Sequence, residues 1–246
     1  MGQGMLKRHS GVAIFLHWFN AVCWFFLLIT GLGLVDNKEL QPLGMWLPKA
    51  LQGLFGSSEN LLLAHEICGF TWAGVLLVFA LVFAKTVTIP FLKQIFSFSP
   101  KNDALWLVKK GIQMTMGYKV LARLGFEPKI PDQGFYNVGQ KLFAIPSVLG
   151  GIVIAITGIT MTLSKIYFND PTLVQWSILI HFIIVGLVFA GLLIHIFMAS
   201  IAKGELPALI SMFTGSVPEE YAKHHHKLWY DEIVPERGQN STTGRN

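Results

Sequence analysis

Four histidines lie inside long apolar stretches, and their residue type and spacing could do chemistry. They are His17, His65, His181 and His195. The last two are fourteen residues apart in one uncharged segment. On a helix, both rings would therefore leave the same face, roughly 21 Å apart along the axis. Ionisable side chains in a membrane-length segment are costly, so these four are candidates for function.

The composition indicates what surrounds these segments. Of 246 residues, 52% are hydrophobic and only 13% are charged, whereas a soluble domain carries about 25% charged residues. The net charge of +5 does not indicate a nucleic-acid partner, because the basic residues flank the apolar segments. Cys23 and Cys68 both lie in apolar stretches, so a disulfide framework is not expected. The sequence predicts an integral membrane protein.

The elements that must position the histidines are four apolar segments, each long enough to cross the ~30 Å hydrocarbon core of a bilayer. We expect an all-α membrane protein, a bundle of four transmembrane helices over 11–35, 61–89, 142–163 and 173–202. The first segment is longer than the apolar region of a signal peptide and contains His17, so it is interpreted as a retained span.

The charges of the connections predict the topology. The tail 1–10, the loop 90–140 and the tail 203–246 hold nearly all Lys and Arg, while the other loops are neutral or acidic. By the positive-inside rule both termini and the long loop lie in the cytoplasm, and the protein lies in the bacterial cytoplasmic (inner) membrane. Within the long loop we expect an amphipathic, interfacial helix over 102–116, capped by Asn102 and Asp103.

In this topology the histidines sort into two pairs by depth. His17 and His195 lie toward the cytoplasmic side, and His65 and His181 toward the opposite side. Two imidazoles at one depth, on different helices, are what a haem iron with two axial histidines needs. The pattern therefore predicts two haems b, one near each face of the membrane.

Two glycines agree with this interpretation. Gly69 follows His65 by one turn, and Gly191 precedes His195 by one turn; residues without a side chain would let a flat ring approach the backbone. Two alternatives stay open. An intramembrane histidine can simply form a hydrogen bond between helices, and zinc or copper could be the ligand. A closed tetrahedral metal site is disfavoured, because Glu66 is the one acidic neighbour and the sequence has no Cys-x-x-Cys pair.

Short motifs accompany the histidines. A His-Trp pair stands at 17–18, and the triplet Leu-Ile-His occurs at 179–181 and 193–195. The segment 136–141 reads Tyr-Asn-Val-Gly-Gln-Lys, and 223–233 reads Lys-His-His-His-Lys-Leu-Trp-Tyr-Asp-Glu-Ile. In these motifs the chain resembles the gamma (cytochrome b) subunits of membrane-bound formate dehydrogenases of the nitrate-inducible type.

The resemblance implies an electron-transfer role. Such a subunit is a quinone-reducing membrane anchor that takes electrons from an iron–sulfur (beta) subunit. That subunit receives them from a molybdenum- or tungsten-containing formate-oxidising (alpha) subunit. The resemblance also implies that His65 with His181 holds the periplasmic-side haem and that His17 with His195 holds the cytoplasmic-side haem.

It further implies a site for menaquinone or ubiquinone beside the cytoplasmic-side haem, formed by Asn137 and Gly139 with His195 close by. Gln140 and Lys141 stand at the same membrane entry, and polar groups near a proton source suit quinone reduction. The alternative for Asn137 is an ordinary helix cap, which the sequence supports equally.

Other functions remain open at this stage. The same kind of dihaem subunit could serve a hydrogenase or a thiosulfate-type reductase. A haem-free transporter could use the histidines as a proton relay, and a plain membrane anchor would need none of them. The run 224–226 is His-His-His where the family has His-His-Pro. Adjacent residues on a helix point about 100° apart, so we expect contacts with a partner subunit or lipid headgroups there, not a metal site.

Overall fold

The computed structural model describes residues 4–127, 129–202 and 204–240. It divides into two units, each described by itself below. Unit 1 comprises Met1–Ser10, Ile89–Pro146 and Leu192–Asn246, and unit 2 comprises Gly11–Thr88 and Ser147–Gly191.

Within residues 4–127, 129–202 and 204–240, four helices are long and apolar enough to cross a membrane. They are α1 (Gly11–Gly33), α3 (Ser58–Val82), α7 (Val138–Leu163) and α8 (Pro171–Ser200). Few of their side chains are buried in the isolated chain, as expected of helices whose solvent is lipid. The prediction of an all-α membrane protein with four transmembrane helices is confirmed.

Three of these helices begin two to four residues before the expected positions 61, 142 and 173. Polar caps set their starts. The Ser57 hydroxyl accepts a hydrogen bond from the Asn60 backbone N–H (3.2 Å) at the start of α3. Asp170 Oδ1 accepts from the backbone N–H of Thr172 (2.9 Å) at the start of α8. The apolar pattern marks where a helix enters lipid, whereas the cap marks where its hydrogen bonding begins.

The second span does not run unbroken to 89 as expected. The α-helical part of α3 ends at Val82, and the chain continues through a π-helical turn, η1 (Ala84–Thr88), into α4 (Ile89–Ile95). Pro90 stands in the first turn of α4, where a missing N–H costs little. The hydrophobic stretch therefore divides into separate helical pieces.

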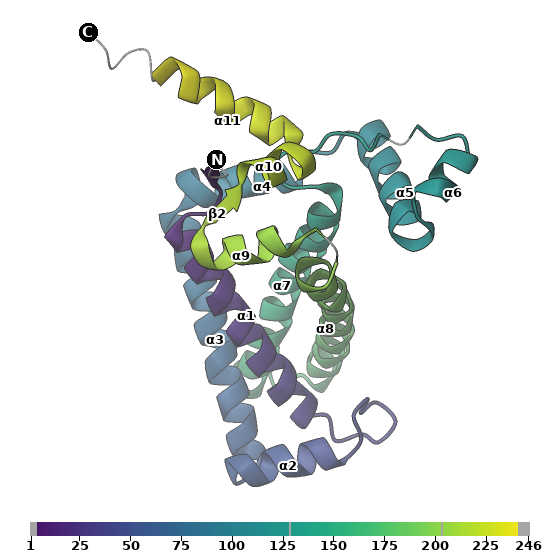
Figure 1. Cartoon of the computed structure of the whole chain (residues 1–246). Coiled ribbons are helices and arrows are strands. Elements are labelled where there is room, and N and C mark those ends of the chain that lie inside the picture. The colour runs from purple at the N-terminus through teal and green to yellow at the C-terminus, as the bar shows by residue number, and fades with distance from the viewer. Residues whose placement is uncertain (1–3, 128, 203, 241–246) are drawn as a thin grey trace. The chain divides into compact units, whose positions relative to one another are not determined.

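In unit 2, α1 and α3 run side by side and antiparallel, joined through α2 (Trp46–Phe55) in the loop after α1 (Figure 1). The sequence did not predict α2. A Cβ added to Gly33 would lie 2.6 Å from Leu51 Cδ1 and 3.0 Å from Leu61 Cδ2. A side chain at this position would force the two leucines to move, so the glycine allows the three helices to pack closely.

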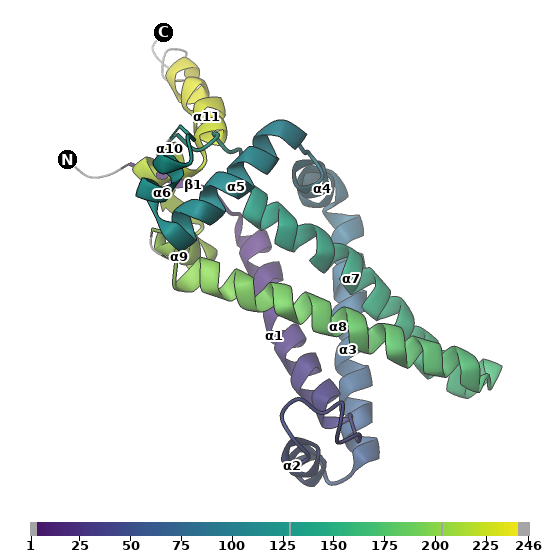
Figure 2. The same cartoon turned by 90° about the vertical axis from the view of Figure 1, so that its right-hand side faces the viewer.

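The other two spans form a second antiparallel pair within unit 2 (Figure 2). A Cβ on Gly150 of α7 would lie 2.6 Å from Val188 Cγ2 of α8. The connection consists of a π-helical turn, η2 (Ser164–Phe168), and Asn169, which adopts a left-handed conformation with φ of 45°. Small residues again allow close helix packing.

In unit 1, the N-terminal segment meets the C-terminal tail. Strand β1 (Met5–Lys7) pairs antiparallel with β2 (Ser216–Pro218), with Leu6 opposite Val217. Helices α9 (Leu206–Thr214), α10 (Glu219–His225) and α11 (Lys227–Asn240) make up the rest of the tail. The buried core here, termed the tail core below, consists of Leu6, Val217, Tyr221, Ala222 and Trp229.

Arg8 contacts both the long loop (90–140) and the tail core. Its Nη2 donates a hydrogen bond to the Phe135 carbonyl oxygen (2.6 Å). Its guanidinium carbon lies 4.5 Å from the centre of the Phe135 ring and 5.1 Å from that of Trp229. A buried guanidinium stacked on aromatic rings contributes by cation–π attraction and by packing.

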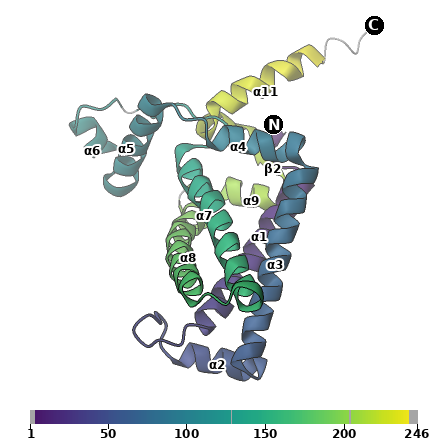
Figure 3. The same cartoon turned by 180° about the vertical axis from the view of Figure 1, so that it is seen from behind.

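The long loop contains α5 (Pro100–Met116) and α6 (Tyr118–Arg123), which pack on each other (Figure 3). The expectation that α5 starts with a cap at Asn102 and Asp103 is wrong. The cap residue is Ser99, whose backbone N–H donates to Asp103 Oδ2 (3.0 Å). Proline at the first helical position fixes that start.

Candidate functional site

His65 of α3 is held by a threonine on α1. Its Nδ1 lies 2.8 Å from Thr30 Oγ1, and that oxygen lies 2.8 Å from the Phe26 carbonyl oxygen. A hydroxyl has one proton and a carbonyl oxygen can only accept, so Thr30 donates to Phe26 and accepts from the Nδ1–H of His65. In a neutral imidazole this hydrogen-bond network assigns the proton to Nδ1 and leaves Nε2 with its lone pair.

His181 of α8 has the same support from α7. Its Nδ1 lies 2.9 Å from Thr157 Oγ1, which donates to the Val153 carbonyl oxygen (2.8 Å). Because the Thr157 proton is donated to Val153, Thr157 accepts from the Nδ1–H of His181, which leaves Nε2 unprotonated. The imidazoles of His65 and His181 thus both present the nitrogen that binds metals.

A third hydrogen bond links α3, which carries His65, to α7, which carries the support of His181. The Thr162 hydroxyl on α7 donates to Glu66 Oε1 on α3 (3.1 Å), one residue from His65. Together with the two threonine–histidine bonds, it connects α1 to α3, α3 to α7 and α7 to α8. All four spans are joined at the end of unit 2 that holds the starts of α3 and α8, and both histidines lie in this part of unit 2.

Each supporting threonine precedes a glycine that makes room for the ring. A Cβ on Gly31 would lie 3.2 Å from His65 Cε1, and one on Gly158 would lie 3.7 Å from His181 Cε1. The triplet Ile-Thr-Gly occurs at both 29–31 and 156–158. This repeat is the signal by which the sequence could have revealed the two supports, which sequence reasoning missed.

The other two histidines fall in different units, so each is described separately. His17, in unit 2, meets the Trp18 ring edge-on, with centroids 5.3 Å apart. His195, in unit 1, stacks on Phe143 with centroids 4.4 Å apart and an interplanar angle of 10°. Their pairing with each other stays a prediction.

The two predicted haem-packing glycines also stay predictions. A Cβ on Gly69 would meet Leu27 Cδ2 at 3.8 Å, an ordinary contact, so close helix packing does not require glycine there. Gly191 lies in α8, one turn before His195.

The donor set fits a haem iron. In residues 4–127, 129–202 and 204–240, no group of three or more His, Cys, Asp or Glu could hold a metal ion, whereas a structural zinc site needs about four such ligands. A haem iron needs two axial ligands, and neutral imidazoles whose Nδ1–H is hydrogen-bonded are oriented for this task. His65 and His181 each have Nδ1 hydrogen-bonded in this way; that they share one iron stays a prediction.

The predicted quinone residues lie in unit 1, at the start of α7. Asn137 Oδ1 accepts from the Gln140 backbone N–H (2.9 Å), and Gln140 Oε1 accepts from the Asn137 N–H (3.0 Å). This reciprocal capping box is the structural role that the sequence allowed for Asn137. A Cβ on Gly139 would lie 3.7 Å from Trp106 Cη2. Lys141 Nζ donates to the Ser97 carbonyl oxygen (2.7 Å).

Comparison with known proteins decides the family. Residues 8–215 match the family described as prokaryotic cytochrome b561. The chain belongs to this family. As a cytochrome b561 relative it is a multi-pass membrane protein, and haem b is the cofactor that the family implies.

Three cytochromes that this chain resembles are subunits of formate dehydrogenases. The formate dehydrogenase cytochrome b556 subunit of Haemophilus influenzae is 31% identical over 229 residues, which cover 92% of this chain and 83% of the relative. The nitrate-inducible formate dehydrogenase cytochrome b556(Fdn) subunit of Escherichia coli K12 is 28% identical over 93% of this chain and 92% of the relative. The cytochrome b556(fdo) subunit of the same strain is 21% identical over 93% of each. The resemblance found in the motifs is confirmed.

In this cytochrome, the three consecutive histidines do different things. His226 is completely buried, and its Nδ1 donates to the Gly134 carbonyl oxygen (2.8 Å). Burial, with the nearby Arg8, lowers the pKa of His226 to about 3. The expectation of a partner or lipid contact is wrong for this residue, because no part of it reaches the surface. Sequence reasoning could not see the burial, which depends on the distant loop.

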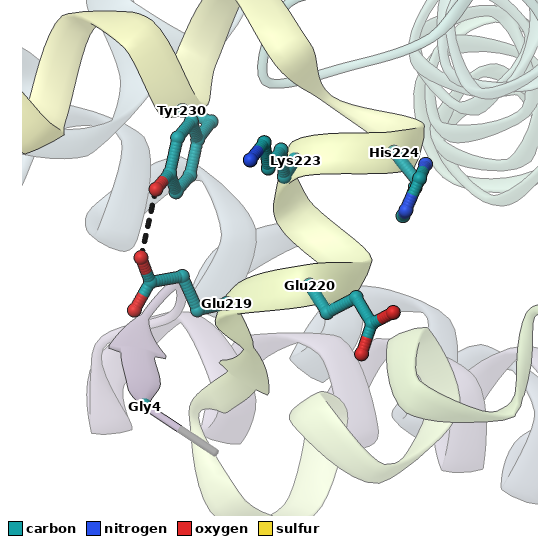
Figure 4. Close-up of a pocket in the computed structure, with 6 residues that line it drawn as sticks. All are labelled: Gly4, Glu219, Glu220, Lys223, His224 and Tyr230. Atoms are coloured by element: carbon teal, nitrogen blue, oxygen red, sulfur yellow. Dashed lines mark hydrogen bonds between the residues drawn. The ribbon is translucent and has the colours of Figure 1, made fainter.

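The other two histidines of the run lie nearer the surface. His225 stacks on Tyr221 with centroids 4.5 Å apart, and its Nδ1 lies 3.4 Å from Glu205 Oε1. His224 lines an open pocket of about 450 Å³ together with Gly4, Glu219, Glu220, Lys223 and Tyr230 (Figure 4). The three side chains therefore do not converge on one metal.

Proposed function

We propose that this chain is the dihaem cytochrome b anchor of a formate dehydrogenase complex in a bacterial inner membrane. It would pass electrons from an iron–sulfur (beta) subunit to a membrane quinone, and the beta subunit would receive them from a molybdenum- or tungsten-containing formate-oxidising (alpha) subunit. The names of the relatives support this proposal. The similarity to these relatives covers 92% and 93% of this chain.

The observation that carries the proposal is the matched pair of threonine–histidine bonds. Thr30 and Thr157 orient His65 and His181 with Nδ1 engaged and Nε2 available. These two histidines would hold one haem, and His17 with His195 the other, which the depth of the residues in their spans supports. Bound haem supplies a reversible one-electron carrier. The chain supplies the imidazoles, which Thr30 and Thr157 hold in place.

The quinone site would lie at the start of α7, with Asn137, Gly139, Gln140, Lys141 and His195. Quinone reduction consumes two protons, so the site needs polar groups that reach water. Lys141 lies 3.6 Å from the carboxylate of Asp103, and the lysine side chain keeps 12% of its surface exposed. Asn137 and Gln140 use their side-chain oxygens in the cap, so their amide N–H groups are the parts that would donate to a quinone oxygen.

The orientation has both termini in the cytoplasm. The pairing of β1 with β2 in unit 1 needs the segments before the first span and after the last span to lie on one side of the membrane, which an even number of spans allows. The basic loop and tails then face the cytoplasm, as the positive-inside rule expects. On α5, Leu107, Val108 and Met114 are exposed while Lys101 and Lys110 lie on the same helix, which supports an interfacial position among lipid headgroups.

A haem count tests the proposal. The complex would be purified with wild-type chain and with His65→Ala, His181→Ala, His17→Ala and His195→Ala, and reduced-minus-oxidised spectra recorded. Two haems b per wild-type chain are expected. The first two variants should lose one haem, and the last two should lose the other. His224→Ala serves as the control and should keep both, because this residue lines a surface pocket.

Two outcomes would contradict the proposal. Loss of the same haem in His65→Ala and His17→Ala would refute the pairing, and a wild-type complex without b-type spectra would refute the cytochrome function. Mass spectrometry of the copurified subunits tests the enzyme assignment. A nickel–iron or sulfur-reducing partner in place of a formate-oxidising one would redirect the chain to a hydrogenase or a thiosulfate-type reductase.

A further inference from the structure

Thr30 and Thr157 occupy equivalent places in two different spans. Each is the middle residue of an Ile-Thr-Gly triplet, close to the end of its helix. Each is almost completely buried, with 2% and 7% of its surface exposed. Each hydroxyl lies between the carbonyl oxygen four residues earlier and an imidazole on the neighbouring helix. The arrangement therefore occurs twice, once for each histidine of the pair.

The direction of these bonds has an electronic consequence. Because the hydroxyl proton is donated to the helix carbonyl, the oxygen presents a lone pair to the Nδ1–H of the histidine. Accepting that hydrogen bond increases the electron density on the imidazole and makes Nε2 a stronger donor. A stronger donor stabilises ferric iron more than ferrous iron, since the ferric ion carries the higher charge. It therefore favours the oxidised state.

We propose that Thr30 and Thr157 are positioning residues that lower the reduction potential of the haem held by His65 and His181. This inference rests on the proposed function, because it requires these histidines to be the haem ligands. A low potential suits the haem at which electrons enter, since transfer to the second haem is then downhill. Both axial ligands carry the same support, so the two effects act on one iron.

The chain offers threonines that serve as controls. Thr71 Oγ1 donates to the Ile67 carbonyl oxygen (2.7 Å), and Thr160 Oγ1 to that of Ile156 (2.8 Å). Thr71 lies on α3 with His65, and Thr160 lies on α7 with Thr157. The hydrogen bonds of both control threonines are exposed, whereas those of the two supports are partly buried. They share the carbonyl bond of the two supports, and among the described residues neither hydroxyl bonds an imidazole.

The test is an optical redox titration of the purified complex. In Thr30→Val and Thr157→Val, the ratio of reduced to oxidised haem at a fixed ambient potential should rise by up to about tenfold, or ~59 mV for one electron. The shift should affect only the haem that is absent from His65→Ala, and the double variant should show the sum of both shifts. Thr30→Ser and Thr157→Ser retain the hydroxyl and should titrate like wild type. Thr160→Val and Thr71→Val should shift nothing.

Each other outcome has a defined meaning. Unchanged potentials in fully loaded Thr30→Val and Thr157→Val, or equal shifts of both haems, would overturn the inference. If a valine variant loses its haem, the serine variant decides: retention of haem supports a role of the hydroxyl, and loss overturns it in favour of packing. If His65→Ala keeps every haem, the proposed function itself fails, which is a different result from an unshifted potential.

Discussion

Substituting Gly31 with alanine should disturb the His65 imidazole, whereas the same change at Gly158 should not disturb His181. The added Cβ would lie 3.2 Å from His65 Cε1 in the first case and 3.7 Å from His181 Cε1 in the second. The first contact forces the imidazole to move by a few tenths of an ångström, while the second is an ordinary van der Waals contact. Overpacking of this kind costs about 1 kcal/mol at the low end of its range, which is roughly a fivefold loss of haem affinity.

Haem retention measures this difference. The purified complex would be incubated with excess of a haem-scavenging protein, and the haem that we propose for His65 and His181 would be followed by its spectrum. Both substitutions replace a helical glycine by alanine and gain about 1 kcal/mol of helix propensity, so that gain cancels in the comparison. Equal retention in the two variants, or weaker retention in Gly158→Ala, would refute the steric reasoning.

Three further predictions concern packing and pH. Gly33→Ala should destabilise unit 2 by about 1–3 kcal/mol through overpacking, whereas Gly74→Ala, with open space around its Cβ, should be tolerated in thermal unfolding. Arg8→Met should loosen the tail core by about 2 kcal/mol, seen as faster proteolysis of the tail, while Lys7→Ala, on the exposed side of β1, should not. The pKa of His226 is about 3 in the folded chain and near 6.5 when unfolded, so the unfolded state binds the extra proton. Tail-core stability should fall as pH drops below about 6.5, by up to about 2 kcal/mol at pH 5; hydrogen exchange of α10 measures this, and His226→Gln should abolish it.

The sequence was most informative where a property repeats along the chain. Apolar segments of membrane length predicted the four spans, because length and composition alone decide whether a helix can cross a bilayer. The starts of the helices were less accurate. At α5, Asn102 and Asp103 looked like the cap, but the carboxylate of Asp103 reaches back to the backbone N–H of Ser99, and such a reach is not encoded in residue type.

The site was predictable in part for the same reason. The histidines stand out because an ionisable residue in an apolar span is rare. Thr30 and Thr157 do not stand out, because a threonine in a membrane helix usually bonds its own backbone, as Thr71 and Thr160 do. Their importance comes from a partner on another helix, which hydrophobic periodicity cannot reveal. The burial of His226 depends likewise on a residue 92 positions away.

The pairing of β1 with β2 sets an order of events during biogenesis. Leu6 pairs with Val217 across the sheet. Because the two residues lie far apart in the sequence, the N-terminal strand is synthesised long before its partner. At about 5–20 residues per second, it waits roughly 10–40 s while all four spans enter the bilayer. The tail core can therefore close only after the last span has been inserted with its end returned to the starting side. A chain inserted with a span missing would leave the two strands on opposite sides of the membrane, and its exposed Leu6 and Val217 would distinguish it from a finished one.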